Sequence, residues 1–404
     1  MSDVYDHELV TSWINTPDPE KHQFTHKYRQ YILAGNYVKQ VRATDIWKAI
    51  LIETQETGIP YKCHKDAGNR KSNQQNLGVI KSSNLCTEIY EYSSGTETAV
   101  CNLASLCLPN FITYTKPDQA DQYPVSQGWT DLTGKQVWFD FKKLIGACKQ
   151  LVYNLNSVID NNFYPIQETR TSNLKHRPVG IGIQGLADVF NICGLVWGSD
   201  QAKKLDFHIA ETIYWGCLKA SNKLAKQQGP YSSWSTSPSK SGILQFDMWK
   251  QENPNSIAYP MHYPWNSIKE QIKRSGLRNS LLVAFMPTAS TSEIMNNSPA
   301  FEPHAAMVYK RTNKEGETMI FNKHLIRTLE QMGLWNKTIQ DKIVSHKHAG
   351  LGDCDQIPDQ VKQVFQTCFD ISPKILIDHA NTRGVFIDQG QSMSLFVAQP
   401  TNKL

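Results

Sequence analysis

An amide, a thiol and a carboxylate alternate along one short stretch of this chain. Asn84, Cys86 and Glu88 occupy every second position of SSNLCTEI, and side chains of an extended backbone alternate between two faces. The spacing therefore predicts that these three groups lie in a row on one face, with Leu85 and Ile89 on the other. A thiol beside a carboxylate is suited to redox or nucleophilic chemistry.

A second thiol, Cys101 of VCNLASL, follows fifteen residues after Cys86. The intervening run SSGT, residues 93–96, is typical of a turn, so we expect the chain to double back and bring the two thiols close together. Packing is the alternative, because Cys is often a small buried hydrophobe and Asn and Glu often flank an ordinary loop. The spacing alone leaves both interpretations open.

A second candidate site follows the apolar run SLLVAFM, residues 280–286, which predicts a short buried parallel strand. Ser290 and Glu293 then fit a capping box, which predicts the start of a helix. Free backbone N–H groups at such a start can bind a phosphate. A plain N-cap explains the same residues and is preferred on sequence alone. The candidate residues are Pro287, Thr288, Ala289, Ser290 and Thr291.

Composition excludes several classes of protein. The 404 residues are 40% hydrophobic and 20% charged, as in ordinary soluble domains. No apolar run reaches membrane-spanning length and the first residues do not form a signal peptide, so we expect a cytoplasmic protein without a membrane contact. Nine cysteines at irregular spacing match neither a secreted disulfide framework nor a zinc pattern. A net charge of +5 without a dense basic run does not predict nucleic-acid binding.

Apolar periodicity predicts the elements that position these residues. We expect a helix over 45–56 capped by Thr44, a loop over 65–78, and a helix over 139–160 that places Cys148 in the core. The remaining expected elements are a long amphipathic helix over 201–228 ended by Gly229, a hairpin over 307–322 turning at Lys314-Glu315-Gly316, helices over 323–332 and 358–380, and a strand over 384–397.

GIGIQG, residues 180–185, formally matches the dinucleotide-binding pattern GxGxxG. That fingerprint requires a buried strand before it, whereas residues 172–178 are polar and basic. We therefore do not interpret this motif as a nucleotide site.

The two thiol-bearing motifs together resemble the catalytic core of the large subunit of class I ribonucleotide reductases. The resemblance extends from about residue 43 to the end of the chain, and the vitamin-B12 and glycyl-radical classes carry a different pattern around their active cysteine. The other matching motifs are NRKSNQQNLG (69–78), HRPVGIGIQGLAD (176–188), PTAST (287–291) and FIDQGQS (386–392).

The resemblance implies an α/β fold, the C-terminal portion of a ten-stranded α/β barrel made of two five-stranded parallel halves. In such a fold the active cysteine lies on an inner finger loop, here residues 79–105, and GIGIQG is a barrel strand with close glycine packing. The partial barrel is expected over 43–404, with a surface insertion over 111–136. Residues 1–42 form a poorly patterned N-terminal segment.

The resemblance also implies a role for each candidate residue. Cys86 corresponds to the cysteine that becomes a thiyl radical and removes the ribose 3′ hydrogen, and Glu88 to the base for the 3′-hydroxyl. Asn84 corresponds to the amide that holds the ribose hydroxyls, and Cys101 to one of two reducing thiols. The PTAST residues correspond to the loop that binds the substrate diphosphate.

The partners implied are a ribonucleoside diphosphate, a radical-generating small subunit with a metal cofactor, thioredoxin or glutaredoxin as reductant, and a second large subunit. No metal is expected on this chain. The second reducing thiol and the nucleotide-sensing region lie in an N-terminal part missing here, and the paired tyrosines of the radical relay lie beyond residue 404. The alternative is an inactive fragment or scaffold relic that binds reductase subunits.

Overall fold

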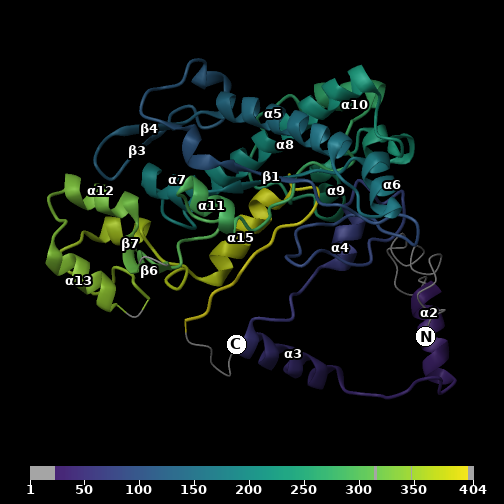
Figure 1. The fold of residues 1–404 in the computed structure, drawn as a ribbon, viewed down its shortest axis with the longest axis horizontal. Coiled ribbons are helices and arrows are strands. Elements are labelled where there is room, and N and C mark those ends of the chain that lie inside the picture. The colour runs from purple at the N-terminus through teal and green to yellow at the C-terminus, as the bar shows by residue number, and fades with distance from the viewer. Residues whose placement is uncertain (1–22, 314–315, 347, 399–404) are drawn as a thin grey trace.

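A computed structural model describes residues 23–313, 316–346 and 348–398 of the chain. The fold is mixed α/β, with helices packed around a small parallel sheet (Figure 1). No helix in the described part of the chain is long and apolar enough to cross a membrane.

The helices and strands follow one another in this order. The first half of the chain contains α2 (Gln23–Leu33), α3 (Ala43–Thr57), α4 (Lys65–Arg70), β1 (Leu103–Cys107), β2 (Ile112–Thr113), β3 (Trp129–Thr130), β4 (Gln136–Phe139), α5 (Phe141–Asn161), α6 (Gln167–His176), β5 (Gly180–Gln184) and α7 (Leu186–Cys193). The second half contains α8 (Asp200–Gln228), α9 (Gln245–Glu252), α10 (Trp265–Ser275), α11 (Ala289–Met295), β6 (Val308–Asn313), β7 (Gly316–Phe321), α12 (Lys323–Gln331), α13 (Lys337–Ser345), α14 (Asp359–Val364) and α15 (Pro373–Gly384).

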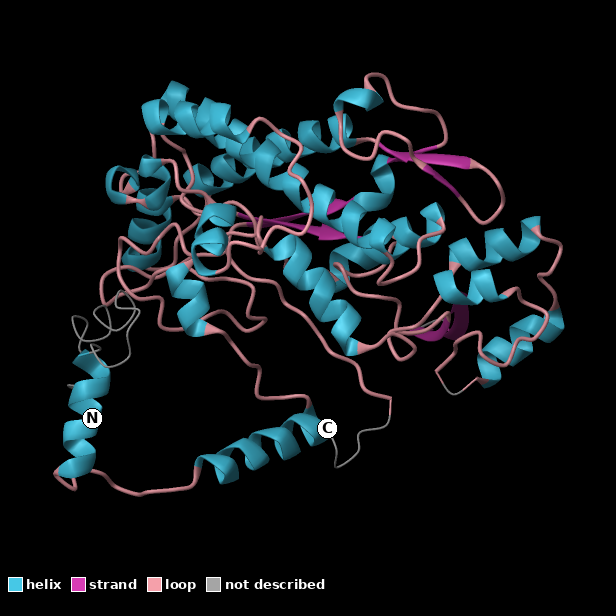
Figure 2. Cartoon of the chain, turned by 180° about the vertical axis from the view of Figure 1, so that it is seen from behind, coloured by secondary structure: helices cyan, strands magenta, loops and turns pink. Residues whose placement is uncertain are grey.

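A parallel sheet occupies the middle of the molecule, covered by helices (Figure 2). β1 pairs with β5, and isolated parallel bridges extend the row from Ile181 to Val283 and from Phe285 to Gln391. The run 281–286 is buried throughout and is parallel to its neighbours, as expected, although it pairs only at these single bridges. The strand expected over 384–397 is wrong except at Gln391, because α15 extends to Gly384 and the following backbone is irregular.

The glycines of GIGIQG allow the neighbouring segments to approach β5 closely. A Cβ on Gly180 would lie 2.6 Å from Leu103 Cδ2, and one on Gly182 would lie 2.5 Å from Met286 Sδ. All five residues of β5 are buried. The sequence prediction of a closely packed strand is confirmed, and a helix, α6, rather than a strand precedes it.

Two long helices pack against this sheet. α5 begins at Asp140, whose carboxylate accepts a hydrogen bond from Lys143 N (2.8 Å), and Cys148 is buried as predicted. A Cβ on Gly216 of α8 would lie 3.0 Å from Cys148 Cβ, so glycine lets the two helices come close together. α8 ends at Gly229 as predicted, but it is not simply amphipathic, because its central residues are buried nearly all round.

A second hydrophobic cluster forms a lobe around β6, β7, α12, α13 and α14, at the left of Figure 1. The hairpin over 307–322 is confirmed by the pairing of β6 with β7, while Lys314 and Glu315 of its turn lie outside the described residues. The helix over 323–332 is confirmed by α12. The single helix expected over 358–380 is wrong, because residues 365–372 separate α14 from α15 and Ser372-Pro373 begin a new helix.

Residues 111–136 contribute to a small antiparallel sheet of order β2-β4-β3. Trp129 and Ala120 of this segment are buried, and they pack under a surface that is otherwise polar. The segment is thus folded, and its status as an insertion stays a prediction.

Two N-terminal helices, α2 and α3, stand apart from the rest of the molecule (Figure 1). The helix expected over 45–56 is confirmed by α3, but Thr44 does not cap it, because Arg42 occupies the N-cap position without a side-chain hydrogen bond. No residue of α3 is buried, and Ile46 and Trp47 remain more than half exposed. Of the N-terminal segment over 1–42, residues 1–22 lie outside the described part.

Candidate active site

The stretch that carries Asn84, Cys86 and Glu88 is a turn rather than an extended row. Thr87 N donates to Asn84 O (3.2 Å), and Thr87 has a φ of 68°, which reverses the chain direction over four residues. The predicted alternation of faces is therefore wrong, and Leu85 and Ile89, expected on one face, differ in burial, with Leu85 84% exposed and Ile89 4% exposed. The three polar groups nonetheless gather, because a turn brings its two ends together.

Asn84 joins the two ends of this turn. Its Nδ2 donates to Glu88 Oε1 (2.8 Å), and its Oδ1 accepts from Ile89 N (3.1 Å). Ser83 Oγ donates to Ile89 O (2.7 Å) and closes the same turn. Glu88 is 2% exposed, and its Oε2 has no hydrogen-bond partner among the described residues. One carboxylate oxygen is thus held by Asn84, while the other is buried without a hydrogen-bond partner among the described residues.

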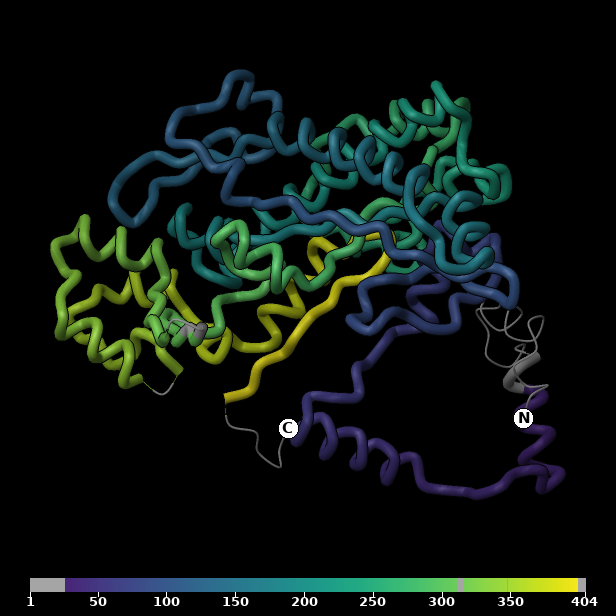
Figure 3. The backbone as a smooth tube through the Cα atoms, viewed as in Figure 1, coloured from purple at the N-terminus to yellow at the C-terminus, as the bar shows by residue number. Residues whose placement is uncertain are grey.

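The segment that contains FIDQGQS packs against this turn and is hydrogen-bonded to it. Gly390 N donates to Glu88 O (2.7 Å), and a Cβ at position 390 would lie only 3.0 Å from Glu88 O and 2.9 Å from Tyr90 Cε2. Gln389 Oε1 accepts from Tyr90 N (3.1 Å). In Figure 3 this C-terminal segment, in yellow, runs back through the middle of the molecule. Its place beside residues 88–90 explains why a glycine stands at 390.

Cys86 lies next to this carboxylate. The thiol is half-buried, and burial, followed by the negative charge of Glu88, raises the pKa of Cys86. Cys86 and Cys101 are both free in the structure. A raised pKa keeps Cys86 as a thiol at neutral pH, and a thiol can give up a hydrogen atom, whereas a thiolate cannot.

The chain reverses at the predicted turn over residues 93–96, and the second limb of the loop then runs from this turn to Cys101. Ser94 N donates to Glu97 O (2.7 Å), and Ala99 N donates to Ser93 Oγ (3.0 Å). Glu97 then anchors this turn to the end of α6 by accepting from Lys175 Nζ and from His176 Nε2 (2.5 Å).

Cys101 keeps access to solvent at the end of this limb. Its surroundings still desolvate the sulfur, and together with the charges of Glu91 and Glu88 they raise the pKa of Cys101 to about 12. Glu88 therefore acts electrostatically on both Cys86 and Cys101. Asn84 and Glu88 are in contact, and both thiols lie within the electrostatic influence of Glu88.

The polar run 65–78, expected to be a loop, begins as the helix α4 and then supports the site. Asn69 exchanges two hydrogen bonds with the backbone of Ile80, at 2.9 and 2.7 Å, and Gln74 Oε1 accepts from Tyr92 N (2.8 Å). Asn69 and Gln74 are both 2% exposed. A solvated connection, which composition alone left open for this run, is therefore contradicted.

The PTAST residues surround the start of α11, but the predicted capping box is wrong. Thr288, not Ser290, is the N-cap, and its buried hydroxyl accepts from Ala300 N (2.7 Å) and is hydrogen-bonded to Ser292 Oγ (2.6 Å). The Thr288 hydroxyl is thus committed inside the protein. Pro287, Ala289, Ser290 and Thr291 are exposed.

The exposed start of α11 faces an open hollow with an empty volume of about 650 Å³, which includes open solvent. Ala289, Ser290, Glu293 and Ile294 line it. The first backbone N–H groups of a helix lack intrahelical partners and are directed outwards, which favours an anion. Glu293 brings a carboxylate to this hollow, which is the opposite of what an anion would need.

The two candidate regions are connected through a single backbone segment. Phe285, two residues before Pro287, donates its N–H to Gly390 O (3.0 Å), and Gly390 N donates to Glu88 O (2.7 Å). The start of α11 and the turn around Glu88 are therefore attached to the same row of parallel segments. This arrangement is compatible with one ligand that contacts both.

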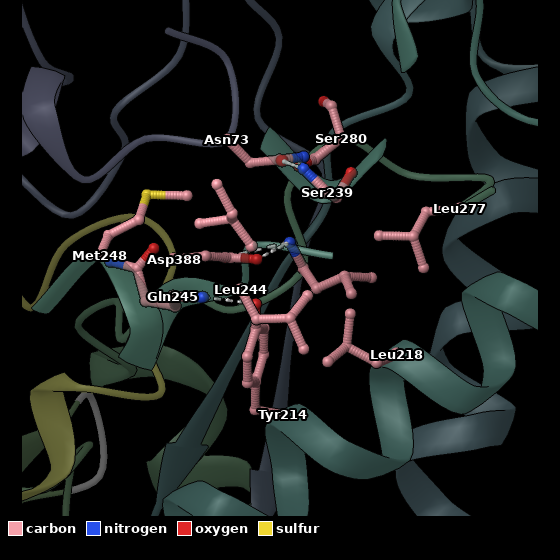
Figure 4. Close-up of a pocket in the computed structure, with 12 residues that line it drawn as sticks. Asn73, Tyr214, Leu218, Ser239, Leu244, Gln245, Met248, Leu277, Ser280 and Asp388 are labelled. Atoms are coloured by element: carbon pink, nitrogen blue, oxygen red, sulfur yellow. Dashed lines mark hydrogen bonds between the residues drawn. The ribbon is translucent and has the colours of Figure 1, made fainter. Parts of the chain in front are cut away.

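Two buried carboxyl groups near the site were missed by the sequence analysis. Glu91 and Asp388 are 5% and 6% exposed, and burial raises the pKa of Glu91 to about 8 and that of Asp388 to about 7. Asp388 accepts from the backbone N–H groups of Leu282 (3.0 Å) and Val283 (2.8 Å). Figure 4 shows it at the centre of a small cavity, between Asn73 and Tyr214.

Sequence patterns give little indication that these two carboxyl groups are buried. Glu91 lies three residues after Glu88, and Asp388 lies within FIDQGQS, but neither motif distinguishes a buried carboxyl from an exposed one. In the described part of the chain, no group of three or more His, Cys, Asp and Glu side chains is placed to hold a metal ion.

Comparison with known proteins agrees with this geometry. The family model for the barrel domain of ribonucleotide reductase matches residues 2–404, so the chain belongs to this family. The ribonucleoside-diphosphate reductase large subunit of Arabidopsis thaliana is 44% identical over 378 residues, which cover 94% of this chain and 45% of that protein.

Relatives from distant organisms give the same result. The large chain of Encephalitozoon cuniculi is 44% identical, over 89% of this chain and 43% of its own length. The large subunit of Danio rerio is 41% identical, over 94% of this chain and 44% of its own length. The chain thus spans less than half the length of these relatives.

Proposed function

We propose that this chain is the catalytic core of a ribonucleoside-diphosphate reductase large subunit, an oxidoreductase of the cytoplasm that makes deoxyribonucleotides for DNA synthesis. The observation that carries the proposal is the turn in which Asn84 binds one oxygen of Glu88, leaves the other free, and sets Cys86 beside it. The family membership supplies the reaction type.

Each residue has a defined part in this proposal. Cys86, kept as a thiol, loses its hydrogen atom to become a thiyl, which removes the ribose 3′ hydrogen. The free Oε2 of Glu88 accepts the 3′-hydroxyl proton, which eases loss of the 2′-hydroxyl as water. Asn84 orients Glu88 and the ribose hydroxyls. Burial of Glu88 favours this chemistry, because few waters compete for its oxygen.

The substrate diphosphate is assigned to Pro287–Thr291. Ala289, Ser290 and Thr291 are exposed at the start of α11, next to an open hollow, and they bring backbone N–H groups and the Ser290 hydroxyl, while the Thr291 hydroxyl donates to Thr288 O. The Thr288 hydroxyl shapes this loop and does not contact the ligand, because it is bonded internally.

The reaction needs partners beyond this chain. The relatives' names support a small subunit as partner, and their lengths support a further part of the large subunit. We assign the radical and its metal cofactor to the small subunit and the second reducing thiol to the further part of the large subunit. Thioredoxin or glutaredoxin regenerates the thiols, and the assembled large subunit is a dimer. No cofactor is assigned to this chain.

An inactive scaffold that binds reductase subunits is the second candidate. Exposed apolar residues on α3 favour a binding role for that helix. A scaffold, however, does not require a buried carboxylate held by an amide beside a thiol, so the reductase proposal accounts for more of the structure.

A reduction assay separates the two candidates. The purified chain alone should be inactive, since in the described residues β1 pairs only on one side and Cys101 has no disulfide partner. Addition of the upstream part of a large subunit, a small subunit and a dithiol reductant should yield deoxyribonucleoside diphosphate. Failure of every such combination would favour the scaffold, and turnover by the chain alone would show that essential parts were misassigned.

A further inference from the structure

A polar cavity outside the proposed active site lies where the small antiparallel sheet, α7 and α12 meet (Figure 1). Its volume is about 90 Å³, and it is partly open to solvent. A water needs about 10–15 Å³ of such space, so the cavity has room for a small anion. It is far smaller than the roughly 300–1,000 Å³ of sites that enclose a drug-sized ligand. The lining residues that matter here are Asp131, Lys135, His324, Arg327 and Thr328.

Two cationic residues line this cavity without a carboxylate partner. Within the described residues, the Arg327 and Lys135 side chains make no ion pair and no hydrogen bond. By contrast, Lys116, in the same segment as Lys135, is paired with Asp121 (2.9 Å). Arg327 belongs to α12 and Lys135 to the turn before β4, so the fold brings the two positive charges to one cavity.

Asp131 is an acidic lining residue, but one of its oxygens is committed to its own loop. Oδ1 accepts from Thr133 N (2.8 Å), from Thr133 Oγ1 (2.8 Å) and from Lys135 N (2.9 Å). Asp131 therefore folds the turn that carries Lys135. One carboxylate against two cations leaves the lining with a net positive charge.

The hydroxyl of Thr328 has no hydrogen-bond partner among the described residues, although Thr328 is only 9% exposed. Other buried threonines donate to the carbonyl four residues earlier in their helix, as Thr212 does to His208 O (2.6 Å) and Thr382 does to Asp378 O (2.7 Å). Thr328 makes no such bond. A nearly buried hydroxyl normally has a partner, so the partner of Thr328 has to come from the cavity.

His324 brings a second polar group to the same cavity. Its Nε2 is bonded to Asp188 Oδ1 (2.8 Å), and Asp188 Oδ2 accepts from Ser298 N (2.6 Å). Burial alone would raise the pKa of Asp188, but these hydrogen bonds hold it well below its usual range. Asp188 is therefore ionised, and Nε2 carries a proton. Nδ1, without a partner among the described residues, donates to an anion when protonated and otherwise accepts from the hydroxyl of hydrogen phosphate.

We propose that this cavity binds a phosphate group, whose charge is balanced by Arg327 and Lys135 and whose oxygens are bound by Thr328 and His324. The planar guanidinium of arginine is suited to phosphate because it can donate two parallel hydrogen bonds. The ligand is free hydrogen phosphate, or the phosphate of a small monoester whose remainder extends into solvent. The bound group joins α12 to the small antiparallel sheet. This site goes beyond the proposed function and is separate from the diphosphate site assigned to Pro287–Thr291.

Calorimetric titration of the full chain with inorganic phosphate, at pH 7 and constant ionic strength, tests this site. We expect saturable binding that Arg327→Gln weakens at least tenfold and Thr328→Val weakens several-fold. Thr328→Val keeps the shape of the side chain and removes a hydroxyl that has no protein partner, so its urea unfolding midpoint should not fall. Arg274→Gln is the matched control, because Arg274 is an exposed arginine on another helix, α10. It should bind phosphate like the parent chain.

Hydrogen exchange at saturating phosphate shows where the ligand binds. Backbone amides of residues 129–136 and 323–331 should become protected in the parent chain but not in Arg327→Gln. Titration with a nucleoside monophosphate distinguishes the two sources of phosphate. Binding that is weakened by the same two substitutions identifies a monoester site, and binding of inorganic phosphate alone identifies a site for free phosphate.

Absence of saturable phosphate binding would overturn the proposal, and so would parent-like affinity in Arg327→Gln or Thr328→Val. Protection confined to residues 287–295 would also overturn it, because phosphate would then bind only at the start of α11. None of these results bears on the proposed reductase function, which uses other residues and is tested by the reduction assay.

Discussion

The turn around Glu88 and the start of α11 differ in how they use their polar groups. In the turn, Asn84 and Ser83 are bonded to neighbouring groups, and the Glu88 carboxylate is buried. At the start of α11, Ser290 and Thr291 are exposed, although the Thr291 hydroxyl donates to Thr288 O (3.3 Å), while the Thr288 hydroxyl is buried and bonded internally. Both regions are attached to the same C-terminal segment through Gly390 and Phe285.

This difference reflects two kinds of task. Groups that transfer hydrogen atoms and protons must be held in position and shielded from water, so their polar atoms are fixed by protein partners. Groups that bind a charged diphosphate must remain open until the ligand arrives. The following predictions test this difference by substituting single residues.

The largest effect should come from Cys86 in the turn. In the assembled reductase, Cys86→Ala should abolish deoxynucleotide formation and leave nucleotide binding intact, because no other thiol lies beside Glu88 with the same burial. Product analysis by chromatography measures this. Cys63→Ala, which removes an exposed thiol from outside the turn, should keep activity, and any turnover by Cys86→Ala would contradict its role.

Cys101 should affect regeneration rather than the first chemical step. Cys101→Ser should permit at most one abortive turnover per site, since the radical step precedes the need for a reductant. Rapid-quench analysis of product per site checks this. Steady-state turnover equal to that of the parent protein with a dithiol present would mean that Cys101 is only structural.

Burial of Glu91 should make the stability of the chain depend on pH. The pKa of Glu91 is about 8 in the folded chain and about 4.3 in the unfolded chain. The protonated Glu91 therefore contributes its full share to the free energy of unfolding below about pH 4, and this share is lost as the pH rises to about 8. The loss is on the order of 4–5 kcal/mol, at about 1.4 kcal/mol per pKa unit.

Urea unfolding at pH 5 and pH 8.5 measures this loss. Glu91→Gln should reduce the fall in unfolding free energy between the two pH values, while Asp388, with its pKa of about 7, keeps part of it. Glu168→Gln should leave the fall unchanged. An equal fall in Glu91→Gln and the parent chain would show that Glu91 is not buried as described.

The smallest effects should separate two hydroxyls of the α11 start. Ser290→Ala should weaken binding of a nucleoside diphosphate by roughly 1.5–3 kcal/mol, the worth of a hydrogen bond to a charged group, without loss of stability. Thr288→Val should instead lower the unfolding free energy by about 1–3 kcal/mol, because Ala300 N loses its acceptor inside the protein. Calorimetric titration measures nucleotide binding, and urea unfolding measures stability. Weaker binding in Thr288→Val with lower stability in Ser290→Ala would contradict the proposed difference between the two hydroxyls.

Much of this molecule follows from local sequence rules. The family resemblance implied the strand at Gly180–Gln184 and the roles of the four loop residues, whereas the turn at 93–96 and the helix ended by Gly229 follow from residue types and spacing. The latter two features depend on the backbone preferences of short segments, which a single sequence expresses directly.

The predictions that failed concern features that depend on contacts between residues far apart in the sequence. The row of Asn84, Cys86 and Glu88 became a turn because Thr87 takes a positive φ, held in place by the approach of Gly390, some 300 residues away. Glu91 and Asp388 look like ordinary acidic residues in the sequence, yet both are buried in the fold, Asp388 by its contact with residues 282 and 283. The hydroxyl of Thr288 is committed by Ala300, which no local pattern indicates.

We propose that the turn around Glu88 and the start of α11 form one substrate site. A crystal structure of the assembled large subunit with a ribonucleoside diphosphate tests it most directly. We predict the ribose hydroxyls within hydrogen-bond distance of Asn84 and Glu88, and the diphosphate on the backbone N–H groups of Ala289–Thr291. A nucleotide whose phosphates lie elsewhere, or whose ribose does not contact Glu88, would contradict this account.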